Sequence, residues 1–211
     1  MRKFVIAALS AVVASACSGS RPPSEPSTVT APLQVSAQPD GIAKNHTTHL
    51  SGDNEPFTPA TPGGPTPADS RAQGQAIFHI AADGLSFDYK LIASNIDNIT
   101  QAHIHCGPAG VNGPIIVWLY PSPTATAALP GGAGRHDGVL AEGTVVSGTP
   151  VHVRSVPNSA ACPGGVSSFA DVIAKIKANN TYVNVHTSDG VNPANTGPGD
   201  FPGGEIRGQL Q

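Results

Sequence analysis

Residues 85–93, Leu-Ser-Phe-Asp-Tyr-Lys-Leu-Ile-Ala, alternate between apolar and polar side chains over their first seven positions. Successive side chains of a β-strand point to opposite faces of a sheet, so this period of two predicts a strand with one buried face. Residues 75–81 alternate in the same way, and Asp83-Gly84 lies between the two segments. An Asp-Gly pair between two alternating segments indicates a β-hairpin.

Further strand patterns follow along the chain and are separated by turns rich in Gly and Pro. They comprise residues 99–106, 115–120, 139–146, 151–153, 182–187 and 205–210. Apolar residues recur at helical spacing only in 169–176, where Ser167 or Ser168 can cap the start, so one short helix is expected near 167–178. Many short strands with turn-rich connections predict an all-β sandwich or barrel.

The first 16 residues have the pattern of a secretory signal peptide. Arg2 and Lys3 form a short basic patch, residues 4–14 are apolar apart from Ser10, and small residues follow. Basic, apolar and small-residue regions in this order are typical of a cleaved export signal. The apolar run is shorter than the ~20 residues that a membrane-spanning helix needs. We therefore expect the mature protein to lie outside the cytoplasm.

Ala14-Ser15-Ala16-Cys17 also resembles the lipobox of bacterial lipoproteins. That resemblance implies cleavage before Cys17, lipidation of its thiol and attachment to the membrane through the lipid. Ala14 stands where the lipobox usually has Leu or Val, so a secreted or periplasmic soluble protein is the alternative. Residues 18–44, rich in Ser, Pro and Thr, are expected to form a flexible linker after Cys17.

Composition narrows the choice of partner. Charged residues make up 12% of the chain and the net charge is −3. Nucleic-acid binding needs clustered Lys and Arg, which this sequence lacks, so no nucleic-acid partner is expected.

Several motifs in the remainder of the chain resemble the CHRD (chordin-type) domain. They are Ala102-His-Ile-His-Cys-Gly107, Gly110-Val-Asn-Gly-Pro-Ile-Ile-Val117, Tyr182-Val-Asn-Val-His-Thr187 and Pro202-Gly-Gly-Glu-Ile-Arg-Gly-Gln-Leu210, with His49–Pro56 and Gly74–Ala76 upstream. The resemblance implies a CHRD domain over 45–211, with an immunoglobulin-like or Greek-key β-sandwich or a barrel. It also implies that the Pro-rich stretch 56–68 is a long loop between the first two strands. Microbial members of the family have no generally established activity.

Cys106 and Cys162 remain once Cys17 is assigned to the membrane. An exported protein meets an oxidising compartment, so these two cysteines are expected to form a disulfide. Cys106 lies on the same strand face as Ile104, which places the bridge inside the domain. The alternative is two buried free thiols.

His103 and His105 are two residues apart on a predicted strand and therefore point the same way, opposite Ile104 and away from the core. His186 faces outward from its own strand by the same reasoning. If the two strands are neighbours, the three imidazoles converge on one exposed patch that suits Cu(II), Zn(II) or Ni(II), with Glu205 as a further ligand or supporting group. The alternative is that these histidines bond loop carbonyls or carboxylates. The other histidines are expected to be structural or solvent-facing: His46, His49, His79, His136 and His152.

No catalytic set is recognisable, because the chain lacks a Gly-x-Ser-x-Gly elbow and its acidic residues show no paired spacing. The sequence therefore predicts a non-enzymatic binding or structural module tethered at the cell envelope, with a protein or glycan partner. The alternative is a metal-binding protein that uses Cu or Zn, either for copper capture or as an oxidoreductase.

Overall fold

The computed structural model describes residues 45–148 and 153–211. The predicted signal peptide 1–16, the lipidation residue Cys17 and the linker 18–44 lie outside the described residues. Residues 149–152 also lie outside them, so only Val153 of the predicted strand 151–153 is described, and it forms a bend.

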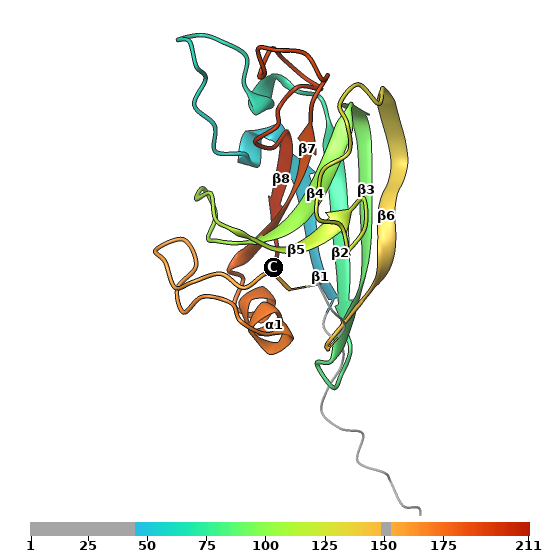
Figure 1. Ribbon diagram of the computed structural model, residues 1–211, viewed down its shortest axis with the longest axis vertical. Helices are drawn as coiled ribbons and strands as arrows, with labels where there is room; N and C mark the ends of the chain where they lie inside the picture. Colours follow the sequence, from blue (N-terminus) through green and yellow to red (C-terminus); the bar gives the residue numbers. More distant parts are fainter. Residues whose placement is uncertain (1–44, 149–152) are drawn as a thin grey trace, which may run out of the picture. The chain divides into compact units, whose positions relative to one another are not determined.

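The described residues form one eight-stranded antiparallel sheet in the order β5-β4-β7-β8-β1-β2-β3-β6. The strands are β1 (Asn45–Ser51), β2 (Gln73–Ile80), β3 (Ser86–Asp97), β4 (Ile99–Cys106), β5 (Ile115–Tyr120), β6 (Arg135–Val146), β7 (Thr181–Thr187) and β8 (Ile206–Gln209). The strongly curled sheet (Figure 1) brings its edge strands β5 and β6 near each other without pairing them, so the barrel is nearly closed. The predicted all-β class is confirmed, in its barrel form.

The predicted hairpin is present between β2 and β3. The Gly84 N–H donates to the Ala81 carbonyl, and Gly84 adopts a φ of +69° that the tight turn requires. The apolar face of both strands enters the core, where the Phe78 ring stacks on Tyr89 with centroids 6.4 Å apart. The alternation of apolar residues therefore predicted correctly which face of each of these strands is buried.

One α-helix, α1 (Phe169–Lys177), lies at one end of the sheet beside the C-terminus (Figure 1). Ser168 caps it by accepting from the Asp171 N–H, while the Asp171 carboxylate accepts from the Ser168 N–H. The apolar stripe of α1 is buried, and Phe169 stacks on Phe87 of the sheet. The helix predicted near 167–178 is confirmed, with Ser168 rather than Ser167 as its cap.

The connection from β1 to β2 covers 52–72 and contains two short 3-10 helices, η1 (Gly52–Asn54) and η2 (Pro67–Asp69). It includes the Pro-rich stretch 56–68, which lies between the first two strands as the family resemblance implied. The loop after β4 meets this connection, because the Asn112 side chain donates to the Pro56 carbonyl.

The chain passes from β3 to β4 through the single residue Asn98, although the two strands stand far apart in the order of the sheet. Asn98 adopts a φ of +57°, and its side chain bonds both Gly134 and Gly199. This corner sets β4 between β5 and β7, which brings the two histidine-bearing segments together.

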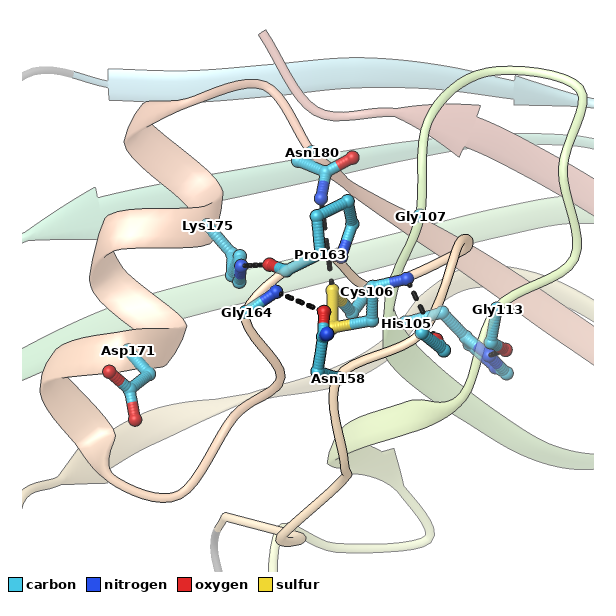
Figure 2. Close-up of a disulfide and its surroundings, with 12 residues drawn as sticks. His105, Cys106, Gly107, Gly113, Asn158, Pro163, Gly164, Asp171, Lys175 and Asn180 are labelled. Atoms are coloured by element: carbon cyan, nitrogen blue, oxygen red, sulfur yellow. Dashed lines mark hydrogen bonds between the residues drawn. A yellow bond between two sulfur atoms is a disulfide. The ribbon is translucent and has the colours of Figure 1, made fainter.

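The Cys106–Cys162 disulfide is present, with the two Cα atoms 5.4 Å apart, and both residues are fully buried. It ties the end of β4 to the segment before α1 and lies next to His105 (Figure 2). Asn180 donates to the Cys106 sulfur at 3.9 Å. The predicted disulfide is therefore confirmed inside the domain.

Candidate metal-binding site

Strands β4 and β7 pair directly, with His103 opposite Asn184 and Gln101 opposite His186. This register brings the three predicted histidines of the motifs together. One ring nitrogen from each of His103, His105 and His186 lies within 4.8 Å of the other two. His103 Nδ1 is 3.2 Å from His186 Nε2. We call these three residues the histidine cluster.

The cluster faces away from the apolar core, as the alternation of β4 predicted, but it is not an exposed patch. The exposed fractions of His103, His105 and His186 are 0%, 7% and 6%. The expectation of solvent exposure is wrong, because loops fold back over the outer face of β4 and β7. Periodicity along a strand reports which face a side chain takes and not what covers that face.

Two of those loops hold the rings through their backbone carbonyls. His105 Nδ1 lies 2.8 Å from the Gly113 carbonyl, and His186 Nδ1 lies 2.8 Å from the Pro202 carbonyl. A carbonyl oxygen only accepts, so Nδ1 of both neutral rings carries the proton and Nε2 carries the lone pair. Carbonyl bonds of this kind orient metal-ligating histidines in proteins.

The cluster contains buried nitrogens without partners. Nε2 of His103 and Nε2 of His105 have no hydrogen-bond partner among the described residues. Buried polar atoms are nearly always paired, because leaving one unpaired costs about 1–3 kcal/mol. The lone pair of His105 Nε2 therefore points to a ligand, whereas His103 can share an ion with His186 only through Nδ1, the atom that faces His186 Nε2.

Burial keeps these imidazoles neutral. The pKa of His103 is lowered to about 2, mainly by burial, with smaller contributions from nearby His186 and His105. Burial also lowers the pKa of His105 to about 3 and that of His186 to about 4, although their carbonyl partners oppose the change. All three rings are therefore in the unprotonated form that binds metal at neutral pH.

Aromatic and cationic side chains pack around the cluster. The Trp118 ring meets His103 edge-on with centroids 4.2 Å apart, and Tyr182 stacks on His105 at 4.8 Å. The Arg207 guanidinium lies 3.3 Å from the centre of the Tyr182 ring. These flat contacts restrict the rotation of the imidazoles, which favours a pre-organised site.

Arg207 is 1% exposed and holds the loop after β4 in place. Its guanidinium donates to the Pro108 carbonyl, the Val111 carbonyl and the Asn112 side chain. Arg207 belongs to one of the motifs that resemble the family, but the sequence gives no signal of this role. The role depends on a loop about 100 residues away in the chain, with sequence separations of 95, 99 and 96.

Glu205 does not join the cluster. Its carboxylate accepts from Ser70 Oγ at 2.5 Å, Thr187 Oγ1 at 2.6 Å and the Gly199 N–H at 2.8 Å. These bonds tie the loop before β8 to the connection before β2. Within residues 45–148 and 153–211, the three histidines form the only group of His, Cys, Asp and Glu side chains arranged for a metal ion.

Two buried polar residues near the cluster were not singled out from the sequence. Asn184 is 2% exposed and follows Val183 on β7, and Glu55 is 8% exposed after η1. Burial raises the pKa of Glu55 to about 7, while Arg207 and a hydrogen bond from Asn184 act in the opposite direction. The alternation of β7 put Asn184 on the histidine face, but nothing local signals the approach of Glu55.

The remaining histidines lie apart from the cluster. His49, His79 and His136 bond neighbouring polar groups near the surface, as expected. His46 is 1% exposed and bonds the Gln211 carbonyl, which is the structural role predicted for it. His152 lies outside the described residues.

The cluster has dimensions close to those of a metal site. Two nitrogens bound to one Zn²⁺ at about 2.0–2.1 Å lie about 3.3–3.4 Å apart at the tetrahedral angle. The His103–His186 pair, at 3.2 Å, already has this spacing. The widest span within the cluster, up to 4.8 Å, exceeds this spacing by about 1.4–1.5 Å, so at least one ring must move when an ion binds.

Comparison with known families gives one result. The family model described as CHRD domain matches residues 46–210. No curated protein and no solved structure matches the chain. Within the described residues, every helix is too short or too polar to cross a membrane.

Proposed function

Because the chain belongs to the CHRD domain family, we propose that it is a binding module outside the cytoplasm whose ligand is a transition-metal ion. CHRD domains are extracellular domains, which agrees with the export signal in the sequence. The observation that carries the metal proposal is the buried cluster of three neutral imidazoles, in which His105 Nε2 has no partner and His103 Nδ1 faces His186 Nε2 at 3.2 Å. A metal ion satisfies such nitrogens without adding a proton to a buried ring.

The donor set indicates which ions fit. Imidazole nitrogen suits Zn and Cu, whereas Mg and Ca prefer oxygen. We propose Cu(II) or Zn(II) as the ligand and capture rather than catalysis as the activity. The rings are almost completely covered, and a catalytic metal site keeps one position open to water or substrate.

Calorimetric titration of the full chain with Cu(II) and Zn(II) at pH 7 tests the proposal. We expect one ion per chain, and at least ~100-fold weaker binding after His105→Gln or His186→Gln, because each change removes a ligand. The matched control is His79→Gln, which replaces an exposed histidine with the same side chain.

The same titration includes an independent readout. Saturation at 100 times Kd should stabilise the unmodified chain by about 2.7 kcal/mol, seen as a higher melting temperature. Absence of both heat and thermal shift with either ion would remove metal binding from consideration.

A protein or glycan partner is the second candidate function. A polar cavity of about 470 Å³ lies between β1, β8 and the loop after β4. Its lining includes His49, Asp53, Asn54, Gln209 and Gln211. Side chains of this type recognise hydroxyl-rich ligands through hydrogen bonds. We expect glycan fragments of the envelope to shift the amide resonances of Asp53 and Gln209, and His186→Gln to leave these shifts unchanged.

We also propose that the mature chain is anchored through lipid on Cys17. Support comes from the small residues before Cys17 and the Ser- and Pro-rich stretch after it. Intact mass of the mature protein should exceed the polypeptide mass by the lipid, and Cys17→Ser should release the protein from membranes. An unmodified N-terminus would instead support the soluble alternative.

A further inference from the structure

We propose that Asn184 supplies a fourth donor to the metal through its side-chain oxygen, and that Glu55 holds the amide in this orientation. This inference rests on the proposed metal-binding function. It makes the site a set of three imidazole nitrogens and one amide oxygen. The class of ligand is a divalent late transition-metal ion in four-coordinate geometry.

The position of Asn184 carries the first step. It lies on β7 opposite His103, and its Oδ1 is 3.0 Å from His186 Nε2. The same Nε2 is 3.2 Å from His103 Nδ1. Both distances approach the edge of about 3.3–3.4 Å of a tetrahedron around Zn²⁺, so the three atoms lie like ligands of one ion.

The hydrogen-bonding capacity of His186 carries the second step. Its Nδ1 faces the Pro202 carbonyl at 2.8 Å, while its Nε2 faces Asn184 Oδ1. A neutral imidazole has one N–H, so one of these two contacts joins two acceptors whichever tautomer forms. If His103 Nδ1 carries a proton, it can donate that proton to His186 Nε2. Asn184 Oδ1 then still faces His186 Nε2, which has no proton to donate to it. A cation between Nε2 and Oδ1 removes this conflict.

Glu55 decides which end of the amide faces the cluster. The Asn184 Nδ2 atom lies beside the Glu55 carboxyl, whose ionised form only accepts hydrogen bonds. With Glu55 ionised, the Asn184 NH₂ faces Glu55, which turns the oxygen toward the histidines. Gly204 packs against this contact, because a Cβ there would lie 2.7 Å from Glu55 Oε2 and 3.0 Å from Asn184 Nδ2. A larger residue would separate the pair.

The four donors are all neutral, and Glu55 is a buried carboxyl behind one of them. Hydrogen bonds from ligands to carboxylates polarise the ligand and tune the metal in other proteins. With four protein donors, no position remains for a bound water. The proposal therefore predicts a closed site that stores or transfers the ion without activating a water molecule.

The test combines affinity with water relaxation on the full chain loaded with Co(II), a paramagnetic ion that adopts the tetrahedral geometry of Zn(II), whereas Cu(II) prefers tetragonal sites that leave room for water. In the unmodified protein we expect tight binding and little enhancement of bulk-water proton relaxation, since no water is bound to the ion. Asn184→Ala should weaken binding at least tenfold and increase the relaxation, because water replaces the amide oxygen. Asn180→Ala, directly before β7 and bonded to the Cys106 sulfur, is the matched control and should change neither quantity.

Two further variants keep the test decisive. Asn184→Ser retains a polar side chain that is too short to reach the ion and should repeat the effect of Asn184→Ala if the latter fails to fold. Glu55→Gln can donate to the amide oxygen and turn it away from the cluster. It should therefore raise the water relaxation, which loss of stability alone would not do.

The outcomes separate the two proposals. No binding of Cu(II), Zn(II) or Co(II) by the unmodified chain would overturn the proposed function and the fourth ligand together. Tight binding with strong water relaxation in the unmodified chain would leave the proposed function standing and assign the fourth position to water. Unchanged affinity and relaxation in the folded Asn184 variants would also exclude Asn184 as a ligand.

Discussion

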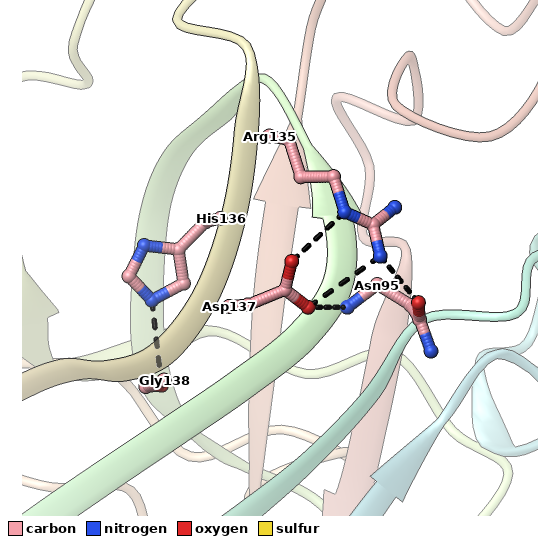
Figure 3. A network of polar contacts seen from close by, with 5 residues as sticks. All are labelled: Asn95, Arg135, His136, Asp137 and Gly138. Atoms are coloured by element: carbon pink, nitrogen blue, oxygen red, sulfur yellow. Dashed lines mark hydrogen bonds and ion pairs between the residues drawn. The ribbon is translucent and has the colours of Figure 1, made fainter.

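The histidine cluster on β4 and β7 and the network of Asn95, Arg135 and Asp137 on β3 and β6 are both polar groups on strands of one sheet. In the exposed network, Arg135 Nε donates to Asp137 Oδ2 at 2.8 Å, and the Asn95 N–H donates to Asp137 Oδ1 at 2.7 Å (Figure 3). Both charged side chains of this network are 52% exposed. The contacts of this network join donors to acceptors, and water can bond the remaining exposed atoms.

The histidine cluster has the opposite character. Its rings are almost fully buried, and two of its nitrogens lack partners among the described residues. Water can replace either partner of an exposed contact, so losing that contact costs little free energy. A buried polar atom without a partner cannot bond water and therefore destabilises the fold. The comparison teaches that the exposed network satisfies its own charged groups, whereas the buried cluster brings together imidazole nitrogens that a ligand can satisfy.

Acid should act on the buried cluster more strongly than any single substitution. The three imidazoles have folded-state pKa values of about 2, 3 and 4, below the 6.5 of the unfolded chain. Between pH 6.5 and 4.5 the unfolded state therefore binds up to three more protons at these sites, so stability falls as the pH falls. Glu55 acts in the opposite direction, because its folded pKa of about 7 exceeds the unfolded 4.5.

The net difference of about two protons gives a loss of about 2.7 kcal/mol per pH unit, or roughly 5 kcal/mol over this window. Urea denaturation of the metal-free chain at pH 6.5, 5.5 and 4.5 measures it. His186→Gln should flatten the dependence, and His136→Gln, in the exposed region, should leave it unchanged. A constant midpoint over this range would mean that the histidines are not held neutral by burial.

Replacing Arg207 tests how far the covering loop depends on one buried cation. Arg207→Met removes three hydrogen bonds to the loop after β4 and leaves Glu55 without its charged neighbour. Removing one partner of a buried charged group costs about 3–5 kcal/mol, so the denaturation midpoint should fall accordingly. Arg207→Lys keeps the charge but loses the planar guanidinium group. Its denaturation midpoint should therefore lie between those of the unmodified chain and Arg207→Met. Equal stability of all three chains would show that the loop is held by other contacts.

Much of this fold follows from short-range patterns. The alternation in β3 and β4 reports strand faces directly, and the Ser168–Asp171 pair reports the start of α1, because these signals act over a few residues. The start of β6 was missed by four residues. Arg135-His136-Asp137-Gly138 shows no alternation, Gly138 has a φ of +127°, and the pairing with β3 shifts nearby.

The full set of residues at the site was harder to predict from the sequence. His103, His105 and His186 could be placed on one face from the sequence, but their burial depends on loops that return from distant parts of the chain. Glu55 enters from the connection after β1, and Asn184 gains its significance only from Glu55 and His186. Such contacts depend on strand order, which the single-residue corner at Asn98 sets without a periodic signal.

Removing the exposed ion pair should have the smallest effect. Arg135→Ala deletes a surface contact to Asp137, and such pairs contribute about 0–1 kcal/mol. The Asn95 N–H contributes most to lowering the pKa of Asp137, ahead of Arg135, so this pKa should rise only in part. Denaturation of Arg135→Ala, Asp137→Asn and the double variant measures the coupling between the two side chains. A loss well above 1 kcal/mol in Asp137→Asn alone would locate the stabilisation in the bond to Asn95, whose φ of +56° needs support, rather than in the ion pair.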